Sequence, residues 1–206
     1  IEIGTKSGNP VMAVTALRPD FDGALVQFLI GLCQTAIPPE DYEEWRGMLL
    51  HPPGPDELRA KLEPIQPAFN LDGNGPRFMQ DPGAADRDYW SIENLIIGMP
   101  EKTKISENTD WFVKRGTVHG LCPKCAAMAL FTLQTNAPSG GRGHMTSLRG
   151  GGPMTCIILG QTLWQTVWVN VIDQESRDCD GNPATAGDSR RFPWMGTLRT
   201  SEGGRK

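Results

Sequence analysis

Residues 22–36, DGALVQFLIGLCQTA, contain the first clear helical pattern in the chain. Apolar side chains recur there and just before it at steps of three and four residues, at Phe21, Leu25, Phe28, Leu29 and Leu32. That period is typical of an amphipathic helix with one buried face. Asp20 or Asp22 precedes the apolar run and has the side chain of a good N-terminal cap. The pattern predicts a helix over residues 22–36.

Two further helices are predicted directly after it. Pro38 and Pro39 end the first helix, and residues 40–50 carry a second apolar stripe, formed by Tyr42, Trp45, Met48 and Leu49. Acidic residues at the start of this segment favour the positive end of the helix dipole. The run Pro-Pro-Gly-Pro at 52–55 stops the second helix, and a short third helix begins at Asp56.

The rest of the chain mixes turns with short elements. Turn-forming residues dominate 67–88, where Phe78-Met79-Gln80 is predicted as a short strand or docked extended piece. Ser91 is a candidate cap for a helical segment at 91–97, and a further helix is predicted over 125–135. Residues 153–159 are apolar and β-branched, which predicts a buried strand, whereas 163–172 fits a helix or a strand.

These elements predict one irregular mixed α+β domain, with several short helices, a small sheet and long Gly/Pro-rich loops. Residues 1–172 form the expected N-terminal domain, and 173–206 a polar, partly basic extension. No internal repeat or heptad pattern is visible. The 24 glycines and 17 prolines in 206 residues agree with long ordered loops.

Composition restricts the class of protein. Apolar residues make up 38% and charged residues 21%, which are values of globular proteins. The formal net charge of −4 means that any site for a polyanion must be local. No apolar run is long enough to cross a bilayer, and the first residues do not resemble a secretory signal. Five cysteines at irregular spacing indicate a reducing cytoplasm rather than a secreted disulfide framework.

Cys122-Pro-Lys-Cys125 has the spacing with which two thiolates bind one tetrahedral zinc ion. No second pair stands at a recognisable spacing, because Cys156 lies in the predicted strand and Cys179 in a polar loop. The same motif at a helix start lowers a thiol pKa and suits a redox dithiol, although a loop precedes it here. Half of a zinc site, a redox dithiol and plain structural cysteines therefore all stay open.

Residues 139–152 are rich in glycine and carry Arg142, His144 and Arg149. The stretch matches neither a Walker A loop nor a dinucleotide fingerprint. Glycine allows close backbone approach to a partner, so such a loop suits the DNA minor groove. A flexible connector explains the same composition.

Enzyme signatures are missing from the sequence. The carboxylate pairs Asp86/Asp88 and Asp178/Asp180 stand in turn-rich segments, where solvated loops explain them. No nucleophile elbow or zinc-protease motif occurs. We expect that the protein is not an enzyme.

A series of motifs in order resembles the CasA family, the large subunit of the type I-E CRISPR surveillance complex Cascade. The series consists of Phe78-Met79-Gln80, Cys122 to Cys125 with Ala126, Ala129-Leu130-Phe131, Asn136 to Pro138, Ser147 to Gly151, and Pro153. The similar order runs from the first helix to Val169-Asn170-Val171. The resemblance covers only that family's N-terminal domain, and the C-terminal helical bundle and first strand are expected to be absent.

The resemblance implies a non-catalytic, cytoplasmic prokaryotic subunit that reads the PAM, the short motif beside a DNA target, from the minor groove. It implies contact with target DNA at Ser139, Gly140, Gly141, Arg142 and Gly143. A second loop, with Phe112, Val113, Lys114 and Arg115, is implied to contact the PAM region or the 5′ handle of the guide RNA. Other Cascade subunits and a helicase-nuclease are the further implied partners.

The resemblance also implies that Cys122 and Cys125 are the first pair of a zinc site whose second pair lies beyond residue 206. Arg142 departs from the aromatic residue or glycine expected there, so the preferred PAM can differ. Two alternative functions remain: a thiol-disulfide oxidoreductase that uses Cys122 and Cys125, and a purely structural Cascade scaffold.

Overall fold

The computed structural model describes residues 5–6, 9–81, 91–97, 107, 116–136, 154–177 and 184–197. Its helices are α1 (Pro19–Ala36), α2 (Tyr42–Leu50), α3 (Pro55–Leu62), α5 (Pro123–Asn136), α6 (Leu163–Trp168) and α7 (Gln174–Arg177). Three 3-10 segments are η1 (Glu63–Phe69), η3 (Ile92–Leu95) and η4 (Pro193–Met195). The short strands β1 (Thr5–Lys6) and β2 (Asn9–Pro10) pair antiparallel, with Thr5 opposite Pro10. The predicted irregular α+β fold is confirmed.

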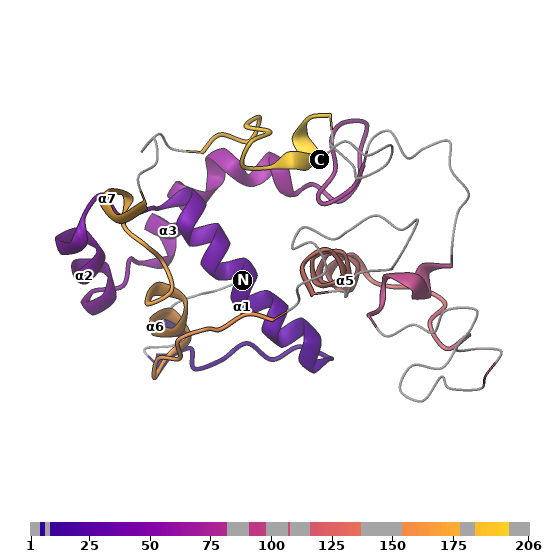
Figure 1. The fold of residues 1–206 in the computed structure, drawn as a ribbon, viewed down its shortest axis with the longest axis horizontal. Coiled ribbons are helices and arrows are strands. Elements are labelled where there is room, and N and C mark those ends of the chain that lie inside the picture. The colour runs from indigo at the N-terminus through magenta and orange to yellow at the C-terminus, as the bar shows by residue number, and fades with distance from the viewer. Residues whose placement is uncertain are drawn as a thin grey trace.

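Helix α1 crosses the centre of the molecule, and α5 and α6 both pack against it (Figure 1). The prediction of this helix is confirmed, but its start differs from the expected one. Pro19 is the first helical residue, a position where its missing N–H costs nothing. The predicted caps are wrong: Asp22 accepts a hydrogen bond from the backbone N–H of Ala16 at 2.6 Å, and Asp20 pairs with Arg18 at 2.9 Å.

Helix α6 resolves the ambiguous segment 163–172 in favour of a helix that ends at Trp168. Thr162 caps its start, since the hydroxyl accepts from the backbone N–H of Gln165 at 3.1 Å. Trp164 and Trp168 stand one turn apart and stack at 5.1 Å with an interplanar angle of 12°. Both rings are buried in the first core cluster, together with Leu29 and Cys33 of α1. Burial of this tryptophan face explains why the helical period prevails over the strand pattern.

Indole N–H groups connect α2 to α6. Trp168 donates to the carbonyl oxygen of Trp45 at 2.8 Å, and Trp45 donates in return to that of Val171 at 2.9 Å. Trp164 donates to the carbonyl of Met48 at 2.9 Å. The residue four positions after Met48 is Pro52, which has no N–H, so the helix itself cannot satisfy this carbonyl. The indole supplies the missing donor, and the two helices are held together by directional bonds as well as by apolar contact.

The end of α1 is tied to the segment after α6 by side-chain amides. Gln34 donates to the carbonyl of Ile172 at 2.8 Å and accepts from its N–H at 2.9 Å. Gln174 donates through its backbone to Pro39 at 2.9 Å and through its side chain to Pro38 at 3.1 Å. These bonds fix residues 172–174 along the end of α1 and the turn that follows it.

A second core cluster lies on another side of α1 and includes side chains from the segment 184–197. Its buried members are Ile65, Ala68, Phe78, Ala184, Phe192 and Trp194. The indole of Trp194 donates to the carbonyl of Ala68. The boundary at residue 172 stays a prediction, and in the described part of the chain beyond it two aromatic residues belong to the core.

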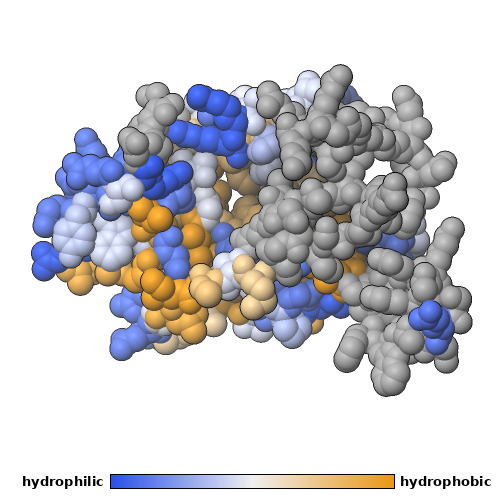
Figure 2. Space-filling view, viewed as in Figure 1, coloured by the Kyte–Doolittle hydropathy of each residue, from blue (hydrophilic) through white to orange (hydrophobic). Residues whose placement is uncertain are grey.

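The segment 153–159, predicted as a buried strand, is corrected by the structure. Residues 154–159 belong to no strand, and Met154, Ile158 and Leu159 are 92%, 64% and 79% exposed. The backbone of Ile158 bonds to a side chain instead of a neighbouring strand. Its N–H donates to Asn170 at 2.9 Å, and its carbonyl accepts from Asn170 at 2.8 Å. Apolar surface gathers in Figure 2 on the side where α6 lies in Figure 1.

The short strand considered at residues 78–80 is also absent from the described chain. These residues form a turn, and Met79 has a φ of 56°, a left-handed value that a strand does not contain. The alternative of a docked piece is correct, because Phe78 is buried and its N–H donates to Asn70 at 2.7 Å. No helix among the described residues is long and apolar enough to cross a membrane.

Gly160 gives a test of how closely 154–161 packs on α6. A Cβ added at Gly160 would lie 2.4 Å from Cβ of Gln165 and 2.8 Å from the backbone N of Thr166. Because backbone atoms block the space, Gly160→Ala should lower the free energy of unfolding by about 1–3 kcal/mol. Urea denaturation measures the change.

Gly47→Ala is the matched control for this substitution. Gly47 lies inside α2, and nothing stands within 4 Å of a Cβ added there. Alanine at this position should stabilise the protein by about 0.4–1 kcal/mol. Equal unfolding midpoints for the two variants would contradict the close packing inferred at Gly160.

Candidate thiol site and its surroundings

Helix α5 carries the Cys-Pro-Lys-Cys motif at its start and packs against α1. Ala129 and Thr132 are buried at this contact, where small side chains let the two helices approach closely. The Thr132 hydroxyl donates to the carbonyl of Met128 at 2.7 Å, so burial leaves no unpaired donor. Phe28 of α1 meets Phe131 edge to face at 5.2 Å. The helix predicted over 125–135 is confirmed, and it carries the motif at its first turn.

Cys122 occupies the capping position of α5. Its carbonyl accepts from the N–H of Ala126 at 2.9 Å, and its Sγ accepts from the N–H of Cys125 at 3.3 Å. The sulfur thereby takes the place that a serine or aspartate oxygen usually has at a helix start. Pro123 follows at the first helical position, where proline is favoured. The motif thus places one exposed thiol at the positive end of a helix 14 residues long.

The two thiols differ in acidity. The backbone N–H of Cys125 lowers the pKa of Cys122 below its ordinary value of 9.0, helped by the side-chain hydrogen bond with Cys125 and the charge of Lys124. The hydrogen bond with Cys122 raises the pKa of Cys125. Cys122 is therefore the first of the pair to form a thiolate, the form that attacks disulfides and binds metals. Burial raises the pKa of Cys33 to about 12, which makes that thiol inert.

Metal-ligating side chains are few around the motif in the described part of the chain. They contain no group of three or more His, Cys, Asp or Glu side chains arranged to hold a metal ion. His119, near the motif in sequence, is exposed. Cys156 is exposed as well, outside any strand, and Cys179 lies beyond the described residues. Cys122 and Cys125 fit two of four zinc ligands by their chemistry.

The predicted DNA-contacting residues all lie outside the described part of the chain. They are Ser139, Gly140, Gly141, Arg142 and Gly143 of the glycine-rich loop, and Phe112, Lys114 and Arg115 before the cysteines. The structure does define helix α5, which stands between these two stretches in the sequence. The chain leaves α5 at Asn136, at the opposite end from Cys122, and 14 residues of helix separate these ends by about 20 Å.

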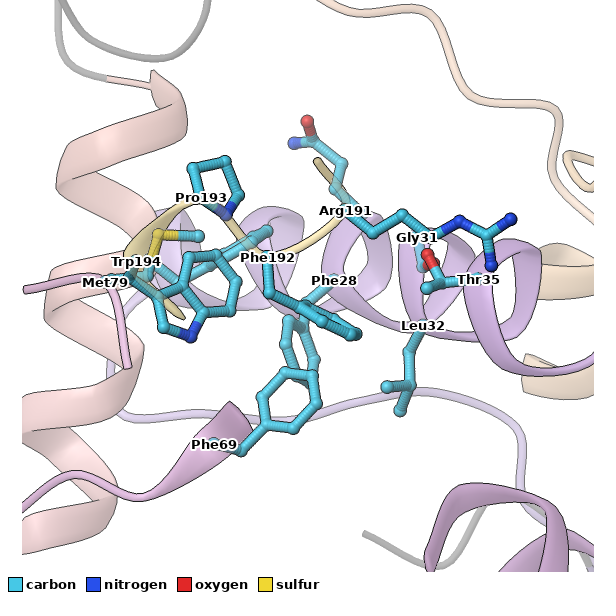
Figure 3. A pocket seen from close by; sticks show the side chains of 12 residues that line it. Phe28, Gly31, Leu32, Thr35, Phe69, Met79, Arg191, Phe192, Pro193 and Trp194 are labelled. Carbon is cyan, nitrogen blue, oxygen red and sulfur yellow. The ribbon is translucent and has the colours of Figure 1, made fainter. Parts of the chain in front are cut away.

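Two cavities border α1 that the sequence does not reveal. One, of about 450 Å³, lies between α1 and α5, with Lys124 at its border and Leu25, Phe28 and Phe131 in its walls. The other, of about 290 Å³, lies between α1 and η4 and is shown in Figure 3. The sequence shows Leu25 and Phe28 only as members of an apolar stripe, not as part of a cavity. The partners that complete the cavities come from segments about 100 and 160 residues further along the chain.

The family model for the CRISPR-associated protein Cse1 matches residues 2–206. The chain belongs to the Cse1 family. The predicted resemblance to CasA is thereby confirmed, because CasA and Cse1 name the same protein in a solved relative.

Two solved structures of Cse1 proteins resemble this chain. CasA (Cse1) of Thermus thermophilus matches with a TM-score of 0.56 and 19% identity, over 86% of this chain and 38% of that one. Cse1 of Thermobifida fusca matches with a TM-score of 0.51 and 21% identity, over 84% of this chain and 37% of that one. At these identities the likeness shows the fold. The chain spans less than two fifths of the length of either Cse1 structure.

The acidity difference predicts the order in which the thiols of this Cse1 chain react. With iodoacetamide, Cys122 should react before Cys125, and its rate should rise with pH through a midpoint below 9.0. Protons leave Cys122 first because its thiolate accepts the Cys125 N–H, so lowering the pH through that midpoint stops the reaction. Mass spectrometry of peptides from timed samples measures both rates.

Two variants separate the causes. Cys125→Ala keeps the backbone N–H that is the main reason for the lowered pKa, so the midpoint at Cys122 should stay below 9.0. Lys124→Gln removes a smaller contribution and should raise the midpoint slightly. Cys33 should stay unmodified in the folded protein. Faster modification of Cys125 than of Cys122 is the result that contradicts the assignment.

Proposed function

We propose that this chain is the DNA-reading part of a Cascade large subunit, a non-catalytic component that recognises the PAM beside a target in double-stranded DNA. The match of the Cse1 family model over residues 2–206 carries this proposal. Within it, the glycine-rich residues 139–143 enter the minor groove, and Phe112, Lys114 and Arg115 contact the PAM region or the 5′ handle of the guide RNA. Other Cascade subunits and a helicase-nuclease are the proposed partners.

The charge of the chain and the geometry of α5 support a local mode of DNA contact. A net charge of −4 cannot hold DNA by a broad positive field. A backbone-rich loop with one arginine can instead approach the groove closely, since glycine has no side chain to obstruct it. The loop follows α5, and buried contacts with α1 fix that helix in position. A probe that makes few phosphate contacts needs such a fixed base, because its affinity alone is low and sensitive to salt.

The decisive experiment changes the loop in the full Cascade complex. Gly140→Leu and Gly141→Leu together should abolish the preference for targets with a correct PAM, because the added side chains prevent close approach to the groove. Binding to matched targets with and without the PAM is measured by gel shift at constant salt. We expect the discrimination between the two targets to fall by about tenfold or more, the size of effect of one lost specific contact.

Gly187→Leu is the matched control, since Gly187 is exposed and has nothing within 4 Å of an added Cβ. It should leave both affinities unchanged. If the doubly substituted loop retains full PAM discrimination while the complex assembles normally, the chain is a structural scaffold and not a reader.

We further propose that Cys122 and Cys125 form half of a structural zinc site. Their chemistry and the thiolate character of Cys122 support this role, and the remaining ligands must come from residues outside the described chain. When bound, zinc would cross-link the start of α5 to another segment. The residues themselves contribute two thiolates, one of them stabilised in advance by the helix N-terminus.

The lowered pKa of Cys122 also favours one alternative, a thiol-disulfide oxidoreductase. A single variant distinguishes the two. In the zinc-site hypothesis, Cys122→Ser lowers the zinc content of the full protein, measured by atomic absorption, and the parent protein does not reduce insulin disulfides with dithiothreitol. Catalysed insulin reduction that disappears in Cys122→Ser, with unchanged zinc content, would establish the oxidoreductase instead.

A further inference from the structure

The cavity of about 290 Å³ between α1 and η4 has an aromatic end with fixed geometry. Phe69, Phe192 and Trp194 line it, with ring centroids 5.5 to 6.2 Å apart. The indole N–H of Trp194 donates to the carbonyl of Ala68, which fixes the orientation of the ring. These walls exist before any ligand arrives, so a planar group that enters pays little for ordering them.

The other end of the cavity is polar. Figure 3 shows the guanidinium of Arg191 on the side of Gly31 and Thr35, away from Phe69 and Trp194. In the described chain Arg191 makes one ion pair, from Nε to Asp188 at 3.7 Å. A guanidinium has five N–H donors, so its terminal nitrogens can still bind an anion. The Thr35 hydroxyl donates to the carbonyl of Gly31 at 2.7 Å and can still accept a hydrogen bond.

Gln27 lines the cavity, and the oxygen of its side-chain amide is buried without a donor among the described residues. Oε1 of Gln27 is inaccessible to water and accepts no hydrogen bond from the described part of the molecule. Its identity as the oxygen is fixed, because Nε2 of the same amide donates to the carbonyl of Gly23 at 3.1 Å. An unsatisfied buried acceptor costs about 1–3 kcal/mol. A ligand with an N–H group, reached by a small rotation of the side chain, would remove that cost.

From this combination we infer that the cavity binds one nucleotide, with its base against the aromatic wall formed by Phe69, Phe192 and Trp194 and its phosphate at Arg191. Bases carry a π-face for the aromatic walls and N–H groups for Gln27. The planar guanidinium of arginine matches the geometry of a phosphate group and can bind it through two N–H groups. The volume lies at the lower limit of about 300 Å³ for small-molecule pockets, which suits a single nucleotide or one nucleotide of a strand.

Gly31 is a helical residue in the wall of the cavity. Glycine inside a helix is less favourable than alanine by about 0.5–1 kcal/mol. Yet nothing lies within 4 Å of a Cβ added at Gly31, so no neighbour demands its absence. Gly31 lines the cavity, and a larger side chain there would project toward the space that the ligand needs. The inference uses none of the residues proposed to contact duplex DNA, and it can fail or hold independently of PAM reading.

The test measures binding to the full chain by saturation-transfer NMR and isothermal titration. The probes are adenosine monophosphate, adenosine, inorganic phosphate and N-acetyltryptophanamide. Adenosine monophosphate should bind about tenfold more tightly than adenosine, as expected for one added hydrogen bond to a charged group. Arg191→Gln should reduce its affinity to that of adenosine. Phosphate alone should not bind measurably.

Gly31→Leu should abolish nucleotide binding by filling the cavity. Gly23→Leu is the matched control on the same helix, because Gly23 also has open space around it and does not line the cavity. It should leave binding unchanged. A single-stranded oligonucleotide that binds more tightly than adenosine monophosphate and is blocked by Gly31→Leu identifies the natural source as a nucleic acid strand. If adenosine monophosphate binds more tightly than the oligonucleotide, the natural ligand is a free nucleotide.

Three results would overturn the inference. The first is the absence of adenosine monophosphate binding to the parent chain. The second is binding that persists unchanged in both Gly31→Leu and Arg191→Gln. The Arg191→Gln variant should fold, because Arg191 has a partly exposed side chain. The third is tighter binding of N-acetyltryptophanamide than of adenosine, which would make the cavity a site for an aromatic side chain of a protein.

Discussion

The two most extensive contacts between helices in the described chain are made by one helix, α1, which has more than one buried face. Leu29 and Cys33 of α1 face the tryptophans of α6, while Phe28 meets Phe69, Phe78 and Phe131 on the other side. A helix that is apolar over most of its circumference must be covered on several sides. With two short strands as the only described sheet, α1 takes the organising place that a central sheet has in other mixed domains. Residues early in the described chain, such as Val11 and Val14, and late in it, such as Phe192 and Trp194, pack in the core clusters along this helix.

The sequence predicts the local elements well where one rule applies. The helices at 22–36 and 40–50 were recognised because periodicity and proline boundaries agree. The prediction of a strand at 153–159 is wrong, because β-branched residues form a strand only if a second backbone pairs with them. In the described structure the side chain of Asn170 bonds to the backbone of Ile158 instead. No local pattern shows that a side chain will replace a strand. The cap of α1 was misjudged in the same way, because Asp22 bonds to Ala16 before the helix.

The candidate site shows the same difference between features that are local in the sequence and features that only the fold creates. Cys122 and Cys125 stand three positions apart in the sequence, and this local spacing already suits a helix N-terminus with a lowered thiol pKa. The nucleotide cavity is invisible to such reasoning, because Gly31, Phe69 and Trp194 are brought together only by the fold. Phe192 and Trp194 stand in a polar segment that looked like an extension, yet both are buried. Isolated aromatic residues in a turn-rich segment are the one signal that could have indicated a docked tail.

The position of α5 links stability to the proposed recognition. Its contact with α1 buries Ala129 and Thr132. Because these side chains are small, the two helices lie close together and have little room to shift. Any movement of α5 would also move Phe131, which borders both cavities, and Cys122 at the far end. A loop that reads a groove by backbone contacts gains specificity only if its anchor is fixed to within a fraction of an ångström. A buried helix with small contact residues provides that anchor, and zinc at Cys122 and Cys125 would restrain its start. Under the proposed function, this acidic chain relies on a rigid anchor where a basic protein relies on charge.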